Sequence, residues 1–215
     1  MDIIILLGAP GSGKGTAAER LAPRLGLRHV SSGALLRAAV AAGTPSGMEA
    51  KGYMEKGALV PDELVGRIIG EQLAAGGQDV RWLLDGFPRT VAQAAMLDEA
   101  AKKAGGAVSK ALLIEVPEDV IVRRLSGRRV CPKCEAGYHV EALPPKVEGV
   151  CDKCGAALVT RPDDNEATIR NRLAVYATST APLAGWYEEL GLLARVDGVG
   201  PADDVAARLV EALDR

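Results

Sequence analysis

The chain has 215 residues, of which 48% are hydrophobic and 25% are charged, and its formal net charge is −2 at neutral pH. This composition is typical of one globular core with room for a small inserted module. The acidic balance disfavours a nucleic-acid binder, which would carry a basic excess. No apolar run is long enough for a membrane span and the N-terminus lacks an export pattern, so we expect a cytoplasmic protein with no membrane partner.

Apolar runs alternate with amphipathic stretches, which predicts βα units and a mostly parallel sheet. The expected strands are Ile3 to Leu7, Arg28 to Val30, Trp82 to Leu84, Ala111 to Val116 and Leu192 to Val196. The expected helices are Lys14 to Leu25, Ala34 to Ala41, Asp62 to Ala74, Val91 to Ala104, Glu118 to Leu125, Asp164 to Leu190 and Ala202 to Leu213. We expect Pro182 to bend or split the long helix, because proline removes a backbone donor.

The segment GAPGSGKGT, residues 8–16, lies between the first strand and the first helix. Backbone N–H groups at such a glycine turn and helix N-terminus attract phosphate, and Lys14 should reach the outer phosphates of a nucleotide. The general pattern has Ser or Thr directly after the lysine, but this chain has Gly15 there and Thr16 one position later. This indicates a kinase that holds Mg²⁺ mainly through water and phosphate oxygens; the alternative is a glycine-rich turn without a chemical role.

Asp85 follows the buried run Trp82 to Leu84 and should lie at the carboxyl end of a strand, where ligands bind in doubly wound sheets. We expect it to anchor Mg²⁺ through water, although it could instead cap the next helix. Arginines could stabilise the negative charge of phosphoryl transfer. The candidates are Arg37, Arg89, Arg124, Arg128, Arg129, Arg161, Arg170 and Arg172. A single arginine is more often a solvated surface charge, but several of these border one unusual segment.

That segment, from about Gly127 to Asp163, has no helical period and contains all four cysteines. They form two C-x₂-C pairs, Cys131 with Cys134 and Cys151 with Cys154. The spacing matches a Cys₄ zinc site with no open position for substrate, so we expect a structural metal. A redox dithiol would need one such pair rather than two, and disulfides are disfavoured in a reducing cytoplasm. His29 and His139 have no partner at motif spacing, and we expect them to be structural or surface residues.

These segments together closely resemble adenylate kinases of the bacterial long form, which belong to the P-loop nucleoside monophosphate kinases and carry a zinc-binding lid. The resemblance runs from Ile3 to the C-terminus. Its motifs are GAPGSGKGT, then SSG (31–33), LLR (35–37), LDGFPRT (84–90), GRR (127–129), YH (138–139), PPK (144–146), RPDDN (161–165) and VDG (196–198). It implies a P-loop NTPase-type α/β fold with a parallel sheet flanked by helices. The implied parts are a core (1–30, 61–126 and 165–215), a helical AMP-binding segment (31–60) and a zinc-ribbon-like lid (127–164).

The resemblance also implies a monomer that transfers a phosphoryl group reversibly from Mg·ATP to AMP, giving two ADP. It assigns ATP binding to Gly11, Ser12, Gly13, Lys14, Gly15, Thr16, Arg124, Arg128, Gly137, Tyr138 and Gly200. It assigns AMP binding to Ser32, Arg37, Ala58, Leu59, Val60, Gly86, Phe87, Pro88, Arg89, Gln93, Arg161 and Arg172. The implied catalytic groups are Lys14, Asp85, Arg89, Arg128, Arg161 and Arg172. Within the AMP site, Gln93 would read the adenine edge.

Two positions depart from the family pattern. Ala34 stands where the family commonly has Asp, so we expect weaker ordering of the Mg²⁺ waters or slower turnover. Gly200 stands where a basic residue is frequent, and we expect little effect because that contact uses the backbone.

Two rival functions differ in the features they require. A kinase acting on UMP, CMP or GMP would share the phosphate loop and arginines, but Gln93 and Ser32 favour AMP. A nucleotide-switched zinc ribbon that binds RNA or DNA would need stacking aromatics on a basic surface, whereas Tyr138 is the one aromatic residue between positions 127 and 163.

Overall fold

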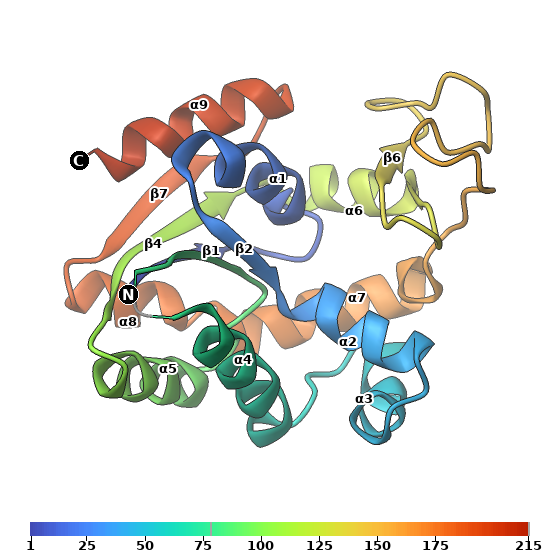
Figure 1. The fold of residues 1–215 in the computed structure, drawn as a ribbon. Coiled ribbons are helices and arrows are strands. Elements are labelled where there is room, and N and C mark those ends of the chain that lie inside the picture. The colour runs from blue at the N-terminus through green and yellow to red at the C-terminus, as the bar shows by residue number, and fades with distance from the viewer. Residues whose placement is uncertain (78, 215) are drawn as a thin grey trace.

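The central sheet has five parallel strands in the order β2-β3-β1-β4-β7, in a computed structural model that describes residues 1–77 and 79–214 (Figure 1). The strands are β1 (Asp2–Leu7), β2 (Arg28–Ser31), β3 (Arg81–Asp85), β4 (Ala107–Glu115) and β7 (Leu193–Asp197). Because β1 pairs with β3 on one side and β4 on the other, the direction of winding reverses at β1. The crevice at the carboxyl end of such a strand is the usual ligand site of doubly wound sheets.

Helices cover both faces of the sheet (Figure 1). The helices of the described residues are α1 (Lys14–Leu25), α2 (Ser32–Ala41), α3 (Pro45–Glu55), α4 (Asp62–Gly76), α5 (Val91–Lys103), α6 (Glu118–Ser126), α7 (Glu166–Val175), α8 (Leu183–Glu189) and α9 (Ala202–Leu213). The predicted fold class, a parallel sheet flanked by helices, is therefore confirmed. No helix within the described residues combines the length and apolarity needed to cross a bilayer.

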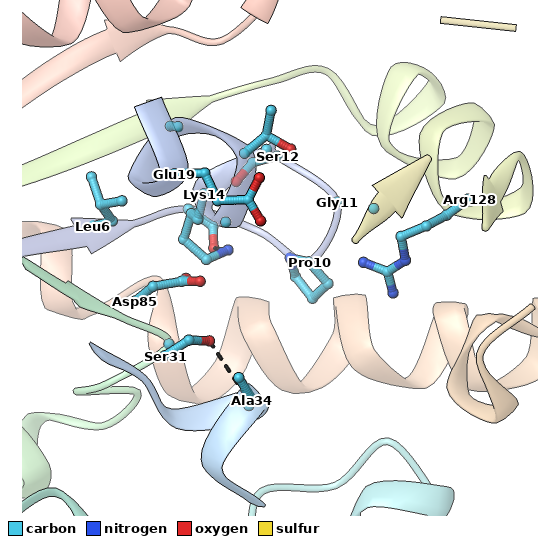
Figure 2. A pocket seen from close by; sticks show the side chains of 18 of the residues that line it. Leu6, Pro10, Gly11, Ser12, Lys14, Glu19, Ser31, Ala34, Asp85 and Arg128 are labelled. Atoms are coloured by element: carbon cyan, nitrogen blue, oxygen red, sulfur yellow. Dashed lines mark hydrogen bonds between the residues drawn. The ribbon is translucent and has the colours of Figure 1, made fainter. Parts of the chain in front are cut away.

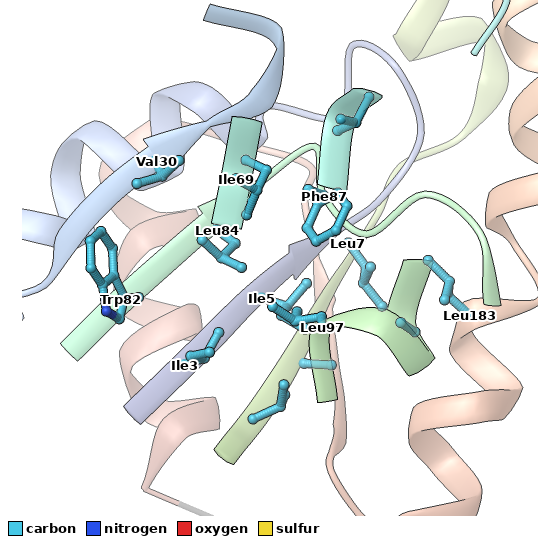
Figure 3. Close-up of a cluster of buried hydrophobic side chains, with 14 of the residues drawn as sticks. Ile3, Ile5, Leu7, Val30, Ile69, Trp82, Leu84, Phe87, Leu97 and Leu183 are labelled. Carbon is cyan, nitrogen blue, oxygen red and sulfur yellow. The ribbon is translucent and has the colours of Figure 1, made fainter. Parts of the chain in front are cut away.

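The side chains of β1 alternate between two hydrophobic cores. Ile3, Ile5 and Leu7 pack with residues of α4, α5 and α8, including Ile69, Leu97 and Leu183 (Figure 3). Ile4 and Leu6 point to the other face and pack with α1 and α9. A strand that is buried on both faces needs apolar side chains at successive positions, which explains the continuous apolar sequence of β1. The phosphate loop therefore follows the central strand of the sheet, which is buried on both faces.

The long helix predicted from Asp164 to Leu190 is wrong in its start and in its continuity. A 3₁₀ turn, η1 (Pro162–Asp164), comes first, and α7 begins at Glu166 because the Asn165 side chain accepts from the Thr168 N–H at 3.0 Å. A π-helical turn, η2 (Tyr176–Thr180), follows α7. The expected break at Pro182 is confirmed, since α8 begins directly after it.

Helix α3 is present although the sequence pattern did not predict it. Its only buried residues are Gly47 and Ala50, so it lacks the apolar stripe by which helices are recognised. The N-terminal signal was nevertheless there, because the Thr44 hydroxyl accepts from the Gly47 N–H at 3.1 Å and Pro45 opens the helix. The segment from 31 to 60 therefore consists mainly of two packed helices, α2 and α3.

The cysteine-rich segment forms a small unit beside α6 and α7 (Figure 1). Two short antiparallel strands, β5 (Arg128–Val130) and β6 (Gly137–His139), lie at its base. Its buried core contains only Cys131, Ala136, Tyr138 and Cys151. The prediction of a segment without helical period is confirmed between 127 and 161, where the structure has strands, turns and bridges. We call residues 127–164 the lid.

Candidate active site

One large cleft, with a volume of about 1080 Å³, lies where the phosphate loop, the lid and α2 meet. A smaller pocket of about 80 Å³ shares Arg37, Gly86, Arg89 and Arg172 with it. With one exception, the residues assigned to ATP or AMP by the resemblance line one of these two spaces. The exception is Phe87, whose side chain is 2% exposed and packs in the core beside Leu7 (Figure 3).

The phosphate loop has a backbone that only glycine accommodates easily. Gly11 has φ +84°, and a Cβ there would lie 2.8 Å from a carbon of Leu125. The Lys14 ammonium donates to the carbonyl oxygens of Gly8 at 2.7 Å and Ala9 at 2.9 Å. Burial lowers the pKa of Lys14 to about 8. The carbonyl oxygens of the loop thus accept the hydrogen bonds that Lys14 could otherwise donate to a phosphate.

Asp85 lies at the carboxyl end of β3, as predicted, and its carboxylate is close to the loop (Figure 2). The residue is 8% exposed, and its Oδ2 lies 3.6 Å from the position of a Cβ built on Gly15. Its negative charge raises the pKa of Lys14 against the larger effect of burial. At this end of the sheet the buried carboxylate can hold a hydrated divalent cation beside a phosphate that pairs with the lysine.

Arginines converge on the same cleft from three parts of the chain. Arg37 comes from α2, Arg89 follows β3, and Arg128, Arg161 and Arg172 come from the lid and α7. Burial is the main cause that lowers the pKa of Arg161 to about 10, and the nearby positive charges of Arg128 and Arg37 contribute to this lowering. Burial is likewise the main cause that lowers the pKa of Arg89 and Arg172. So many buried like charges favour binding of a polyanion.

Two carboxylates that sequence reasoning passed over organise these arginines. Asp164, whose side chain is fully buried, accepts from Arg128 Nε at 2.7 Å and from Arg172 Nη1 at 3.2 Å. Asp163 Oδ2 lies 2.9 Å from Arg172 Nη1. The signal was available, because both acids belong to the RPDDN motif at the end of the lid. In this structure they neutralise two arginines that the sequence assigned to phosphate.

The smaller pocket is bordered by side chains already engaged with protein atoms. Ser32 Oγ donates to the Gly86 carbonyl oxygen at 2.6 Å, and Arg89 Nε donates to the same oxygen at 2.9 Å. Gln93 Nε2 donates to Asp62 Oδ1 at 2.7 Å, while its Oε1 accepts from the Arg89 N–H at 2.7 Å. A base edge that binds Gln93 would have to exchange with one of these partners.

Arg124, expected near the adenine, connects the phosphate loop to the far end of the cleft. Its guanidinium donates to the carbonyl oxygens of Ser12 at 3.2 Å and Gly198 at 2.9 Å. Gly200 lines the cleft two residues beyond Gly198. The flat guanidinium therefore lies between two backbone segments that the resemblance places against ATP.

The four cysteines lie together in the lid, as the spacing predicts. Their sulfur atoms are all within 4.8 Å of one another. Cys131 Sγ lies 3.4 Å from Cys154 Sγ, and Cys134 Sγ lies 3.5 Å from Cys151 Sγ. Four sulfurs around a tetrahedral zinc at about 2.3 Å would be roughly 3.8 Å apart. The cluster is thus compatible with zinc in its ligand type, number and spacing.

The two cysteine pairs differ in the residue that follows them. Glu135 follows the first pair with φ +58°, the one non-glycine residue with positive φ in residues 1–77 and 79–214, whereas Gly155 follows the second with φ +71°.

We expect Glu135→Gly to stabilise the lid by about 1 kcal/mol, because a left-handed conformation strains a residue with a Cβ. Urea unfolding of the full zinc-loaded chain would measure this change in the free energy of unfolding. Glu135→Gln separates charge from backbone strain, and a stabilisation equal to that of Gly would contradict the explanation.

A phosphate loop at the winding reversal of a parallel sheet, facing an arginine-lined cleft, defines a nucleotide kinase of the P-loop class. A family model described as Adenylate kinase matches residues 6–192, and the chain belongs to the adenylate kinase family. Its reaction is the reversible phosphoryl transfer from ATP to AMP that gives two ADP.

Relatives of similar length support the same assignment. The chain is 46% identical over 212 residues to an adenylate kinase of Carboxydothermus hydrogenoformans, covering 99% of each chain. It is 49% identical over 210 residues to an adenylate kinase of Citrifermentans bemidjiense, covering 98% of each. Against an adenylate kinase of Thermodesulfovibrio yellowstonii the identity is 47% over 212 residues, again with 99% of each chain covered.

Proposed function

We propose that the core, the lid and the segment 31–60 divide the two nucleotides between them. ATP binds with its phosphates in the loop from Gly11 to Thr16, under a lid that contributes Arg128 and the backbone at Gly137 and Tyr138. AMP binds on the other side of the cleft, against α2 and the segment that follows β3. The position of all these groups around one cleft supports this division.

The observation that supports the proposed chemistry most strongly is the convergence of Lys14, Arg89, Arg128, Arg161 and Arg172 on one cleft. The phosphate oxygen of AMP attacks the γ-phosphorus of ATP, and the bond to the β-phosphate oxygen breaks, which leaves ADP on both sides. Since the attacking oxygen is already negative, no strong general base is required. The cations instead orient both phosphate groups and neutralise the charge that passes between them.

Asp163 and Asp164 pair with two of these arginines, which must be released before they can bind phosphate. In this structure they hold Arg128 and Arg172 by ion pairs across the end of the lid. We infer that incoming phosphates compete for these guanidinium groups, so that nucleotide binding rearranges the contact between the lid and α7. Closure of the lid would also exclude water, which prevents hydrolysis of ATP in place of transfer.

Two metals belong to the proposal. Mg²⁺ bound with ATP would be held by Asp85 through water and would supply further charge neutralisation; Ala34 offers no second carboxylate for those waters. Zinc would be held by Cys131, Cys134, Cys151 and Cys154 as a structural ion. The cysteines form no disulfide and need to stay reduced to bind zinc, which agrees with a cytoplasmic location. We also propose a monomer, because both nucleotide sites use residues of one chain.

Phosphorus NMR with Mg²⁺ and ATP, offering AMP, CMP, UMP and GMP separately, tests the acceptor. We expect fast conversion with AMP, reversed when ADP is supplied, and at most slow conversion with the others. Preference for another acceptor would keep the chemistry and contradict the roles of Gln93 and Ser32. Absence of transfer to every acceptor would contradict the proposed arrangement of the cations.

The pKa of Lys14, lowered by burial to about 8, predicts a pH dependence of ATP binding. Lys14 loses its proton as the pH rises through this value, and only the charged form pairs with phosphate. The dissociation constant of ATP should therefore rise about fivefold between pH 8 and pH 9. Calorimetric titration of ATP and AMP at both pH values measures this. AMP serves as the control, and an equal change for both nucleotides would exclude Lys14 as the cause.

A further inference from the structure

Tyr138 lines the nucleotide cleft and also belongs to the buried core of the lid. It lies in β6, pairs with Arg129 across the small sheet, and lines the cleft next to Gly137. Its side chain packs with Cys131, Ala136 and Cys151, and the residue is 8% exposed. One residue thus touches both the proposed ATP-covering surface and the cysteine cluster.

The hydroxyl group of Tyr138 is aimed at one cysteine. The Asp152 N–H donates to the Tyr138 oxygen at 2.8 Å, and this oxygen lies 3.5 Å from Cys151 Sγ. Because the backbone amide is a donor, the hydroxyl proton is left to be donated to the sulfur. A thiolate is the better acceptor of the two sulfur protonation states, so the contact is strongest when Cys151 is a metal ligand.

The backbone around Cys151 holds this geometry. The Lys146 N–H donates to Asp152 Oδ1 at 2.9 Å, and the Cys151 N–H donates to the Ala156 carbonyl oxygen at 2.9 Å. The loop that presents Cys151 is therefore held on both sides of the tyrosine contact. Tyr138 itself belongs to the strand after the first cysteine pair, so its hydroxyl connects this strand to the second pair.

We propose that Tyr138 is a positioning residue of the metal centre, whose hydroxyl donates to the Cys151 thiolate and holds β6 against the second cysteine pair. This inference rests on the proposed zinc site and on the proposed role of β6 over ATP. Groups that hydrogen-bond to a metal ligand orient it, and their removal typically weakens metal binding by about 10–100-fold. It follows that zinc binding and ATP binding are coupled. Zinc should increase the affinity for ATP, and ATP should increase the affinity for zinc by the same factor.

Zinc affinity of the full chain, measured by competition with a chromophoric chelator, tests the inference without any nucleotide. We expect Tyr138→Phe to bind zinc about 10–100-fold more weakly, since it keeps the ring and loses only the hydroxyl. Tyr53→Phe is the matched control, because Tyr53 lies on α3 and is 41% exposed. The coupling predicts a raised KM for ATP in Tyr138→Phe, with KM for AMP unchanged.

A second variant keeps the result interpretable. Tyr138→Leu removes the ring as well, so it separates packing from hydrogen bonding. If Tyr138→Phe binds zinc as tightly as the unmodified chain while Tyr138→Leu does not, the ring only packs and the inference is overturned. If the unmodified chain takes up no zinc, the proposed metal site fails first and the inference fails with it; transfer between ATP and AMP would still be measured independently.

Discussion

Replacement of Lys14 by methionine is expected to lower kcat by at least about 10²–10³-fold and to leave the fold intact. Removal of a single preorganised donor to a transition-state oxygen typically has an effect of this size. Methionine keeps much of the length and apolar volume of the lysine stem, so the loop retains its packing. The ammonium that donates to Gly8 and Ala9 is lost, and with it the one lysine of the phosphate loop.

The control for this variant is Lys103→Met, which removes a lysine whose side chain is 74% exposed and lies on α5, outside the cleft. Phosphorus NMR reports transfer for both variants, and circular dichroism with thermal unfolding reports the fold. Lys103→Met should keep full activity. Transfer by Lys14→Met within tenfold of the unmodified protein would contradict the role of the loop lysine.

The elements that sequence reasoning predicted well are those with local signals at both ends. Helix α1 was predicted with its observed bounds, because glycines in a left-handed conformation lie directly before and after it, at Gly13 and Gly26. Helix α3 was missed because its buried face has only Gly47 and Ala50, which give no apolar period. Tertiary contact with α2 stabilises α3, and no pattern within the segment reports such a contact.

The contrast between local signals and tertiary contacts also explains which features of the site could be predicted. Motif positions predicted which residues line the cleft, since a phosphate loop and the residue after a buried strand are local features. The pairing of Arg128 and Arg172 with Asp164 joins the two borders of the lid, so it depends on folding. Phe87 shows what a motif does not predict. A motif names the residue but not the direction of its side chain, and the ring belongs to the core.

We expect the lid to be the part of the molecule whose folding depends most on a ligand. Its buried cluster consists of Cys131, Ala136, Tyr138 and Cys151, while Val140, Leu143, Val147, Val150 and Val159 are exposed. So small a core rarely stabilises a unit of this size without a metal or a disulfide. Zinc binding to small Cys-rich units contributes roughly 10–16 kcal/mol, which is enough to order the segment.

We therefore expect Cys131→Ser to release zinc and to lower the unfolding temperature of the lid well below that of the core. Differential scanning calorimetry with metal analysis would show a separate low-temperature transition, while the five-stranded core unfolds as before. Lys133→Ala is the matched control, since it lies between the same two cysteines and its exposed side chain offers no sulfur ligand. A single unchanged transition in Cys131→Ser, with zinc retained, would contradict a structural metal. Since residues of the lid line the cleft of the proposed ATP site, unfolding of the lid should also raise KM for ATP far more than KM for AMP.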